Sequence, residues 1–391
     1  MTTPPLSTTV FGLSSEGYQI ALTLTKNHIP TIIIDENLKV GMELKPEDVE
    51  NYTSIQALQE GEPLLRVKPF EKALSESKYI FFVPKIRSFG EEVKIEINSR
   101  LRELAKYLPK GSTLINSVPT GIGGNLENIR LIERISGFKW CESFYYVYCP
   151  FIPCSKNPIV IGFDKPKMDK ELLEILQLAG IKPSPLLPLK ISEFAHAKQV
   201  IFHLVDMVTN FELIKKAKEE GIEYLNKVKS FSYREVYLDD LIKHTFDLKI
   251  FTESFSTGEP LLYLSTGILR SISSYIKYLF DELKYFIKTR ELKASKTRII
   301  LVWSLDHFEI RGDRLMNLKN VAERFRDYVG DTIVISKRDE LANMIQPIDK
   351  VHIIIACSKQ DFEIISKMVK DKIIAGGFIV KANLPVELIA E

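Results

Sequence analysis

The sequence predicts an α/β protein in which two regions of alternating strands and helices flank a helical middle. Short apolar runs alternate with amphipathic stretches over residues 1–188, and a second alternation covers residues 291–391. Between them, residues 191–220 keep a continuous helical period and contain neither Pro nor Gly. Strand–helix alternation is typical of parallel, doubly wound sheets. We therefore expect an N-terminal Rossmann-like doubly wound parallel sheet, an all-helical middle domain with a long central helix, and a C-terminal Rossmann-like α/β domain.

In the N-terminal region, each expected strand is a short apolar run and each expected helix has a 3.6-residue period. The predicted strands are 8–11, 31–34, 79–83, 113–115, 144–148 and 159–161, and the predicted helices are 16–26 and 95–107. A proline-rich stretch, 183–188, cannot be helical and suits a linker. The first domain is therefore expected to cover residues 1–188.

The helix predicted over 191–220 is about 45 Å long at 1.5 Å per residue. Further helical patterns at 237–244 and 266–286 complete an expected middle domain, 189–290. In the expected C-terminal domain, 291–391, the predicted strands are 299–303, 332–335, 351–356 and 378–381, and the predicted helices are 315–328 and 360–369. A chain of 391 residues is longer than one typical core supports, which agrees with several domains.

The composition is that of an ordinary globular protein, with 45% apolar and 27% charged residues. Lys and Arg total 53 against 51 Asp and Glu, which excludes a strongly basic nucleic-acid binder. The apolar runs are too short to span a membrane, and the first ten residues lack a secretory signal pattern, so we expect a cytoplasmic protein. The four cysteines have no zinc-ligand spacing, so we expect no metal site. Enrichment in Ile, Lys and Glu is typical of thermophile proteins.

A glycine-containing turn follows the first predicted strand. The segment Gly12-Leu13-Ser14-Ser15-Glu16-Gly17 opens a helix, and Asp35 ends the second predicted strand 18 residues later. A dinucleotide-binding fold uses three glycines in this turn and an acid about 20 residues on for the ribose hydroxyls. Ser14 replaces the middle glycine, so we expect a weakened NAD site. A strand–turn–helix without a ligand is the alternative.

Several further motifs occur in order between residues 10 and 162. They are Val10 to Gly17, Gly61-Glu62-Pro63, Phe82-Val83-Pro84, Ser117 to Gly121, Glu133 to Gly137, Tyr148 to Phe151 and Ile159 to Gly162. Their order and spacing resemble those of the UDP-glucose/GDP-mannose dehydrogenase family. That resemblance implies an NAD-binding Rossmann domain, a helical domain that dimerises through its long helix, and a C-terminal domain that helps to bind a UDP-sugar.

The resemblance also implies which residues would bind ligands. The cofactor-binding candidates are Gly12, Leu13, Ser14, Gly17, Asp35, Pro84 and Ser117. Asp313-Arg314 is loosely similar to the family's substrate loop, so Arg314 is a candidate substrate-binding residue. The long helix over 191–220 implies a homodimer.

The same comparison finds the catalytic positions altered. The family reaction uses a Cys nucleophile, a Glu, and a Lys/Asn pair. Here the segment 254–261 has no Cys, Phe151 stands at the Glu position, His196 at the Lys position and Val200 at the Asn position. Such groups act as a unit, and losing one costs orders of magnitude in rate. We therefore expect the family reaction to be absent.

Three functional hypotheses remain open. The first is a non-catalytic relative of the nucleotide-sugar dehydrogenases that acts by nucleotide binding or assembly. The second is an NAD-dependent oxidoreductase with altered two-electron chemistry, in which His196 is a candidate acid or base and a structural histidine is the alternative. The third is a structural or nucleic-acid-associated protein that uses the basic segment 288–298, for which a solvated connector is the alternative.

Overall fold

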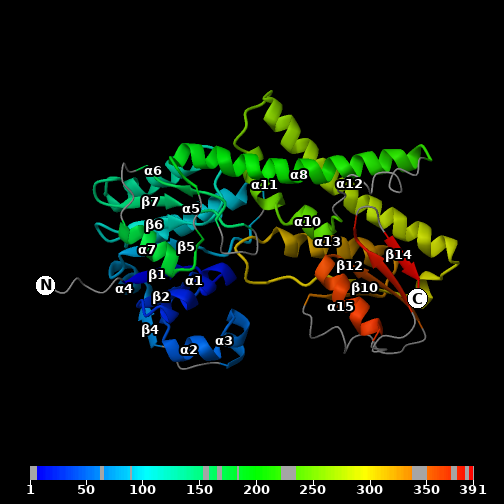
Figure 1. The fold of residues 1–391 in the computed structure, drawn as a ribbon, viewed down its shortest axis with the longest axis horizontal. Coiled ribbons are helices and arrows are strands. Elements are labelled where there is room, and N and C mark those ends of the chain that lie inside the picture. Colours follow the sequence, from blue (N-terminus) through cyan, green and yellow to red (C-terminus); the bar gives the residue numbers. More distant parts are fainter. Residues whose placement is uncertain are drawn as a thin grey trace. The chain divides into compact units, whose positions relative to one another are not determined.

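The computed structural model describes residues 7–61, 66–88, 90–152, 158–164, 170–182, 185–221, 235–336, 350–370, 377–383 and 387–390. Within the chain two compact units are distinguished (Figure 1). The first comprises Met1–Gln199, Lys249–Ser256 and Asp306–Gly312, and the second comprises Val200–Leu248, Thr257–Leu305 and Asp313–Glu391. The division into domains 1–188, 189–290 and 291–391 stays a prediction. Cys154 and the Glu62-Pro63 part of one motif lie outside the described residues.

The first unit is built on a nine-stranded sheet with the order β4-β3-β2-β1-β5-β6-β7-β8-β9. Its strands are β1 Thr8–Phe11, β2 Thr31–Asp35, β3 Val40–Glu43, β4 Arg66–Pro69, β5 Tyr79–Phe82, β6 Thr113–Asn116, β7 Tyr145–Tyr148, β8 Ile161–Gly162 and β9 Leu186–Leu187. From β2 through β1, β5 and β6 to β7 every pairing is parallel. The predicted doubly wound α/β fold is therefore confirmed.

Strand β1 lies between β2 and β5, so the chain leaves β1 toward one side and returns to its other side. In open α/β sheets, ligands bind in the crevice at the carboxyl ends of the strands where the order reverses. Here that switch point lies between β1 and β5, whose residues Phe11 and Phe82 are paired and fully buried. The turn after β1 is thus the place where a ligand site is expected.

The helices of the first unit connect these strands. They are α1 Ser15–Lys26, α2 Pro46–Asn51, α3 Ile55–Gly61, α4 Phe70–Ser75, α5 Glu92–Ala105, α6 Gly124–Ser136 and α7 Lys170–Leu178. Two helices, α8 Leu189–Glu219 and α11 Thr245–Thr252, contain residues of both units. The long helix predicted over 191–220 corresponds to α8, which begins two residues earlier.

The described part of the proline-rich stretch 183–188 is not helical, as predicted, but it contains a short strand that the prediction missed; its role as a linker stays a prediction. Leu186 and Leu187 form β9, which pairs with β8, and the Ile161 N–H donates to the Pro185 carbonyl at 3.0 Å. Proline lacks an N–H and is tolerated at a sheet edge, where one side of the strand has no ladder partner. Strands β3 and β4 were also missed, because neither VGME nor RVKP shows a clear apolar alternation.

The second unit has a five-stranded sheet with the order β11-β10-β12-β13-β14, and it confirms the predicted C-terminal α/β region (Figure 1). Its strands are β10 Thr297–Val302, β11 Thr332–Ile335, β12 Val351–Ala356, β13 Gly377–Lys381 and β14 Glu387–Ala390, and only β14 is antiparallel to its neighbour. Its helices are α10 Leu238–Ile242, α12 Pro260–Thr289, α13 Asp313–Tyr328 and α15 Lys359–Lys370, with a 3₁₀ turn at Ala294–Lys296. The core includes Ile300, Ile354 and Ile365.

The basic segment 288–298 is not a plain connector. Lys288 belongs to the last turn of α12, and Arg298 lies in β10, where its Nε donates to the Asp331 carboxylate at 2.9 Å. Nucleic-acid binding through this segment stays a prediction. Within the part of the chain that the structure describes, no helix is long and apolar enough to cross a membrane.

Replacement of Gly12 by Ala is expected to lower the free energy of unfolding by about 3 kcal/mol or more. Gly12 has φ +124°, and an added Cβ would lie 2.4 Å from the Pro84 Cα. The matched control is Gly267→Ala in α12, where a Cβ meets nothing within 4 Å. That change should stabilise the helix by roughly 0.5–1 kcal/mol. Urea denaturation of both variants checks the prediction, and equal effects would contradict it.

Candidate functional site

The structure brings the predicted loop residues together with Pro84. Gly12 packs against the turn after β5, and a Cβ on Gly17 would lie 2.7 Å from the Gly12 carbonyl oxygen. The Ser14 hydroxyl caps α1, because it accepts the Gly17 N–H at 3.1 Å and donates to the Val83 carbonyl at 2.5 Å. Ser14 is completely buried, so its hydroxyl serves the helix terminus and the neighbouring loop.

The acid that faces this loop is Glu36, which the sequence analysis missed. Its carboxylate accepts the Leu13 N–H at 2.8 Å and the Lys85 N–H at 3.0 Å, and the residue is 1% exposed. The predicted ribose-binding acid, Asp35, instead caps the following turn by accepting the N–H groups of Asn37 and Leu38. The sequence does show an acid, Glu36, directly after the buried strand that ends in Asp35. It does not show that the N–H groups of Leu13 and Lys85 converge on this acid.

The segment 306–312, which belongs to the first unit, also packs against the glycine-containing loop. The Phe308 carbonyl accepts the Ser15 N–H at 2.8 Å, and the Ile310 carbonyl accepts the Ile86 N–H at 2.8 Å. The Ile310 N–H in turn donates to the Glu16 carboxylate at 3.0 Å. These hydrogen bonds join the segment to the first turn of α1 and to the chain after β5.

Arginine side chains hold the segment 306–312 in place. The Arg87 guanidinium donates to the carbonyl oxygens of His307 at 2.8 Å and Glu309 at 2.9 Å. Arg311, which is 2% exposed, donates to the Phe151 carbonyl at 2.8 Å. Gly312 is needed here, because a Cβ would lie 2.7 Å from the Ile86 carbonyl oxygen. The segment is therefore a built part of the first unit.

Four of the six backbone N–H groups of the loop 12–17 donate to acceptors within the protein. The N–H groups of Gly12, Leu13, Ser15 and Gly17 donate to the Ile34 carbonyl, Glu36, the Phe308 carbonyl and Ser14, respectively. In a dinucleotide-binding fold, N–H groups of this turn and helix terminus face the pyrophosphate. In this chain a carboxylate and a carbonyl of the protein accept two of them. A pyrophosphate does not fit this arrangement.

The remaining predicted cofactor residue, Ser117, lies after β6. Its N–H donates to the Phe82 carbonyl at 3.1 Å, and its hydroxyl is buried without a partner among the described residues. The structure thus places the Ser117 backbone beside the end of β5. Within the described residues there is also no group of three or more His, Cys, Asp or Glu that could hold a metal.

His196, the candidate acid or base, is enclosed in the first unit. Its Nδ1 is hydrogen-bonded to the Tyr148 hydroxyl at 2.8 Å, and its ring packs edge-on against Phe251 with centroids 5.0 Å apart. Tyr148 also contacts the Thr120 N–H, at 3.3 Å. His196 has no exposed surface, so this geometry favours a structural role.

Burial also raises the pKa of the Cys149 and Cys357 thiols, which disfavours either as a nucleophile.

Arg314, the candidate substrate-binding residue, forms a buried ion pair in the second unit. Its Nη1 donates to Asp239 at 2.8 Å, and the Trp303 indole N–H donates to the same carboxylate oxygen at 2.7 Å. Asp313 beside it accepts a hydrogen bond from Thr245. The side chain of Arg314 is 8% exposed. The structure therefore uses Arg314 to join α10 and α13.

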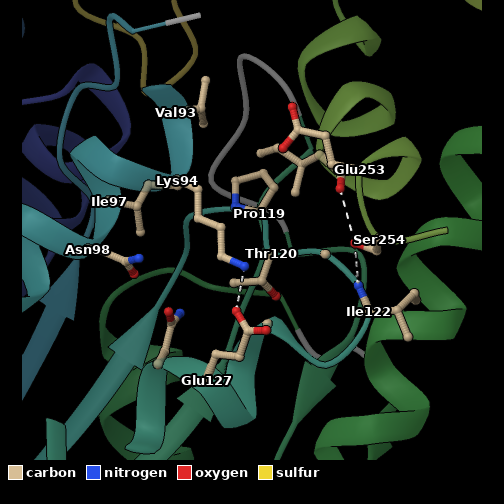
Figure 2. A pocket seen from close by; sticks show the side chains of 14 residues that line it. Val93, Lys94, Ile97, Asn98, Pro119, Thr120, Ile122, Glu127, Glu253 and Ser254 are labelled. Carbon is tan, nitrogen blue, oxygen red and sulfur yellow. Dashed lines mark hydrogen bonds and ion pairs between the residues drawn. The ribbon is translucent and has the colours of Figure 1, made fainter. Parts of the chain in front are cut away.

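A cavity of about 270 Å³ lies at the carboxyl end of β6, and Figure 2 shows the side chains around it. Its lining comes from α5, from the turn between β6 and α6, from the first turns of α6 and from the end of α11. Lys94 extends across the cavity to Glu127, with 2.6 Å between their charged atoms. Ser254 accepts the Ile122 N–H at 3.1 Å, which closes one side. Pro119, Thr120 and Gly121 of the lining belong to the motif Ser117 to Gly121, but that motif does not by itself predict a cavity.

The nearby N-terminus of α6 already holds an anion from the protein. The Glu193 carboxylate accepts the Gly123 N–H at 2.7 Å and the Asn125 N–H at 3.0 Å, and it also accepts the Asn125 side-chain amide. Burial raises the pKa of Glu193, while these hydrogen bonds lower it. Glu193 thus serves α6 in the way that Glu36 serves the turn after β1.

Neither a family model nor a curated protein matches this sequence. Solved structures match its fold. UDP-D-ManNAc dehydrogenase from Pyrococcus horikoshii is 14% identical, with 96% of this chain and 94% of that chain covered and a TM-score of 0.65. UDP-glucose dehydrogenase from the hyperthermophilic archaeon Pyrobaculum islandicum is 14% identical, with 97% and 95% covered and a TM-score of 0.61. UDP-N-acetyl-mannosamine dehydrogenase from Staphylococcus aureus is 14% identical, with 89% and 88% covered and a TM-score of 0.59.

These similarities cover almost the whole chain and establish the fold. The chain has the architecture of the nucleotide-sugar dehydrogenases, so the resemblance predicted from short motifs is confirmed at the level of the fold.

Glu16→Gln is expected to remove a pH dependence of stability. Burial raises the Glu16 pKa from 4.5 to about 7. The folded state therefore holds this proton more tightly than the unfolded chain, so the associated stability is complete below pH about 4.5 and is lost as the pH rises through 7. A glutamine keeps an oxygen for the Ile310 N–H and stays neutral.

Urea denaturation at a series of pH values checks this prediction. Between pH 4.5 and 8 the wild type should lose about 3 kcal/mol relative to Glu16→Gln. The exposed Glu47→Gln serves as the matched control and should follow the wild type. A constant difference between wild type and Glu16→Gln across this range would contradict the assigned role.

Proposed function

We propose that this protein is a non-catalytic relative of the nucleotide-sugar dehydrogenases that acts by binding or assembly rather than by oxidation. The observation that carries the proposal is the occupation of the turn after β1 by the protein itself. Glu36 accepts the Leu13 N–H, and the Phe308 carbonyl accepts the Ser15 N–H. NAD would have to displace a buried carboxylate and a hydrogen-bonded segment before its pyrophosphate reached this turn.

The altered catalytic positions support the same proposal. Phe151 and His196 stand where the resembled family has a Glu and a Lys, and the segment 254–261 has no Cys. The reaction of the resembled family transfers a hydride to NAD, so an occupied turn after β1 and missing catalytic groups both argue against that reaction. The dehydrogenase fold would then remain as a scaffold for another ligand or partner.

An NAD-dependent oxidoreductase with altered two-electron chemistry is the second candidate. One observation favours it: the hydrogen-bonded pair of Tyr148 and His196 lies at the carboxyl end of β7, the edge of the sheet where dinucleotide enzymes bind their ligands. This candidate requires the segment 306–312 to move away from α1. It also requires His196 to become accessible.

We also propose a homodimer that forms through α8 and α12. Several large apolar side chains on these helices are well exposed, including Phe202 at 68%, Tyr263 at 66%, Leu213 at 47% and Leu264 at 43%. Within the second unit, α8 and α12 enclose an apolar groove that is lined by Val205, Leu213 and Leu264 among others. Exposed apolar surface of this kind favours a protein partner, and a second copy supplies a matching apolar face.

Isothermal titration calorimetry with NAD and NADH tests the main proposal. We expect no saturable binding to the wild type in the micromolar range, whereas the Pyrococcus horikoshii dehydrogenase in the same buffer serves as the positive control. Micromolar binding to the wild type, or measurable oxidation of a UDP-sugar, would overturn the proposal. NAD binding gained by Glu36→Ala would attribute the closure to Glu36, and continued absence of binding would attribute it to the segment 306–312.

Size-exclusion chromatography with light scattering tests the dimer. The wild type should elute as a dimer, and Leu213→Glu and Leu264→Glu should shift it to a monomer, because a charge in an apolar interface remains unpaired. Leu173→Glu on α7, where the wild-type side chain is 41% exposed, is the matched control and should leave the dimer intact. A monomeric wild type would disprove this assembly.

A further inference from the structure

Four exposed cations lie within residues 288–296, between the end of α12 and the start of β10 in the second unit. These cations, called here the basic cluster, are Lys288, Arg290, Lys293 and Lys296. The same stretch contains a single acid, Glu291, and none of the four cations has an ion pair within the described part of the chain. The net charge of the whole chain is only +2, so the excess of positive charge is local to this segment.

The cations next to the basic cluster are neutralised by the protein. Arg298 Nε and Lys350 Nζ lie 2.9 and 2.6 Å from the same oxygen of the Asp331 carboxylate. A cation that is paired in this way has little charge to offer to an anion from outside. The basic cluster therefore keeps a positive field that its neighbours do not cancel.

The backbone at the end of α12 fixes where these cations lie. The Glu291 N–H donates to the Lys288 carbonyl at 3.1 Å, and the Leu292 N–H donates to the Ile287 carbonyl at 3.0 Å. This is the hydrogen-bond pattern of a Schellman turn, and Glu291 has the φ of +54° that such a turn requires. A 3₁₀ turn over Ala294–Lys296 follows directly. The basic cluster thus stands on ordered turns.

Stabilisation of the helix accounts for only half of the basic cluster. Cations near a helix C-terminus interact favourably with the carbonyl groups that lack a partner there. Lys288 in the last turn and Arg290 at the cap have that position. Lys293 and Lys296 lie beyond the helix, where this effect has fallen off. Their exposed charges are therefore available to another molecule.

Aromatic side chains accompany the cations. Tyr285 is 67% exposed and lies one turn before Lys288, on the same face of α12. The Arg290 guanidinium lies 5.9 Å from the ring centroids of both Phe286 and Phe378, so these rings orient it at the surface. Cations that contact phosphates, beside an aromatic ring that stacks on an unpaired base, are the combination that binds single-stranded nucleic acid.

Other anionic surfaces fit this arrangement less well. Binding to an anionic membrane usually adds large apolar side chains that enter the lipid, whereas the exposed uncharged residues of 288–296 are Thr289, Ala294 and Ser295. In a duplex the bases stack on one another, so Tyr285 would find no free base to contact. The exposed ring therefore favours a single strand.

From these observations we propose that the end of α12 binds single-stranded nucleic acid. The basic cluster contacts phosphates of the backbone, and Tyr285 stacks on a base without reading its identity. The inference goes beyond the function proposed above and does not depend on it. Tyr285 lies about 32 Å along α12 from Leu264 of the apolar groove, at 1.5 Å per residue, so the two surfaces are separate.

Fluorescence anisotropy on the full chain tests the proposal. The probes are labelled oligo(dT) and oligo(rU) of about 20 nucleotides and a duplex of the same length. We expect at least one single strand to bind with a Kd on the order of 10 µM in 50 mM salt, and four phosphate contacts predict a slope of about −3 for log K against log salt. The duplex should bind more weakly. Absence of binding by both single strands, or a duplex that binds at least as tightly, would overturn the proposal.

Variants assign the binding to this surface. The double variant Lys293→Gln/Lys296→Gln should weaken binding about tenfold and reduce the salt slope by about 1.4. Tyr285→Ala should also weaken binding about tenfold but leave the salt slope unchanged, and Tyr285→Phe should restore the affinity because it keeps the ring. The charge-matched control is Lys26→Gln/Lys182→Gln, at two exposed positions of the first unit, which should leave the Kd unchanged.

Two results would contradict the assignment. Unaltered affinity of Lys293→Gln/Lys296→Gln, or an equal loss in the control variant, with folding verified by circular dichroism, would refute this site. Sedimentation with vesicles of phosphatidylcholine and phosphatidylserine, in a protein that binds no oligonucleotide, would assign the basic cluster to a membrane surface instead.

Discussion

The N–H groups of Leu13 and Lys85 come from two different loops and converge on the carboxylate of Glu36. This interaction joins the turn after β1 to the turn after β5, so it lies across the switch point of the sheet. Glu36 is almost fully buried, which makes its two charge-assisted hydrogen bonds necessary for its own stability. The geometry of the crevice, and therefore any ligand that it admits, depends on this carboxylate.

A second buried acid accepts N–H groups at the start of α6, and a third lies beside the first turn of α1. Glu193 accepts two N–H groups at the start of α6, and Glu16 accepts the Ile310 N–H beside the first turn of α1. Helix N-termini are favourable places for negative charge, whether it comes from a phosphate or from a side chain. This chain fills those places with its own acids. The protein thereby gains internal order at these positions.

The segment 306–312 extends that closure over the turn. It reaches α1 through Ser15 and Glu16, and the Glu16–Ile310 hydrogen bond joins residues 294 positions apart in the chain. Closing so long a loop costs entropy, which the hydrogen bonds of Arg87 and Arg311 help to offset. These hydrogen bonds hold the segment against the first turn of α1 and the chain after β5.

The sequence by itself determined the parallel strands, the long helix and the glycine turn, because burial on two faces or on one stripe leaves a local periodic pattern. It also indicated the fold through the order of short motifs. Only the tertiary structure decided that Glu36 rather than Asp35 faces the turn, that Ser14 caps α1, and that Arg314 is held by Asp239. It also decided that Leu186 and Leu187 extend the sheet. Hydrogen-bond partners depend on which distant loops converge in space, and no local pattern of residues records that.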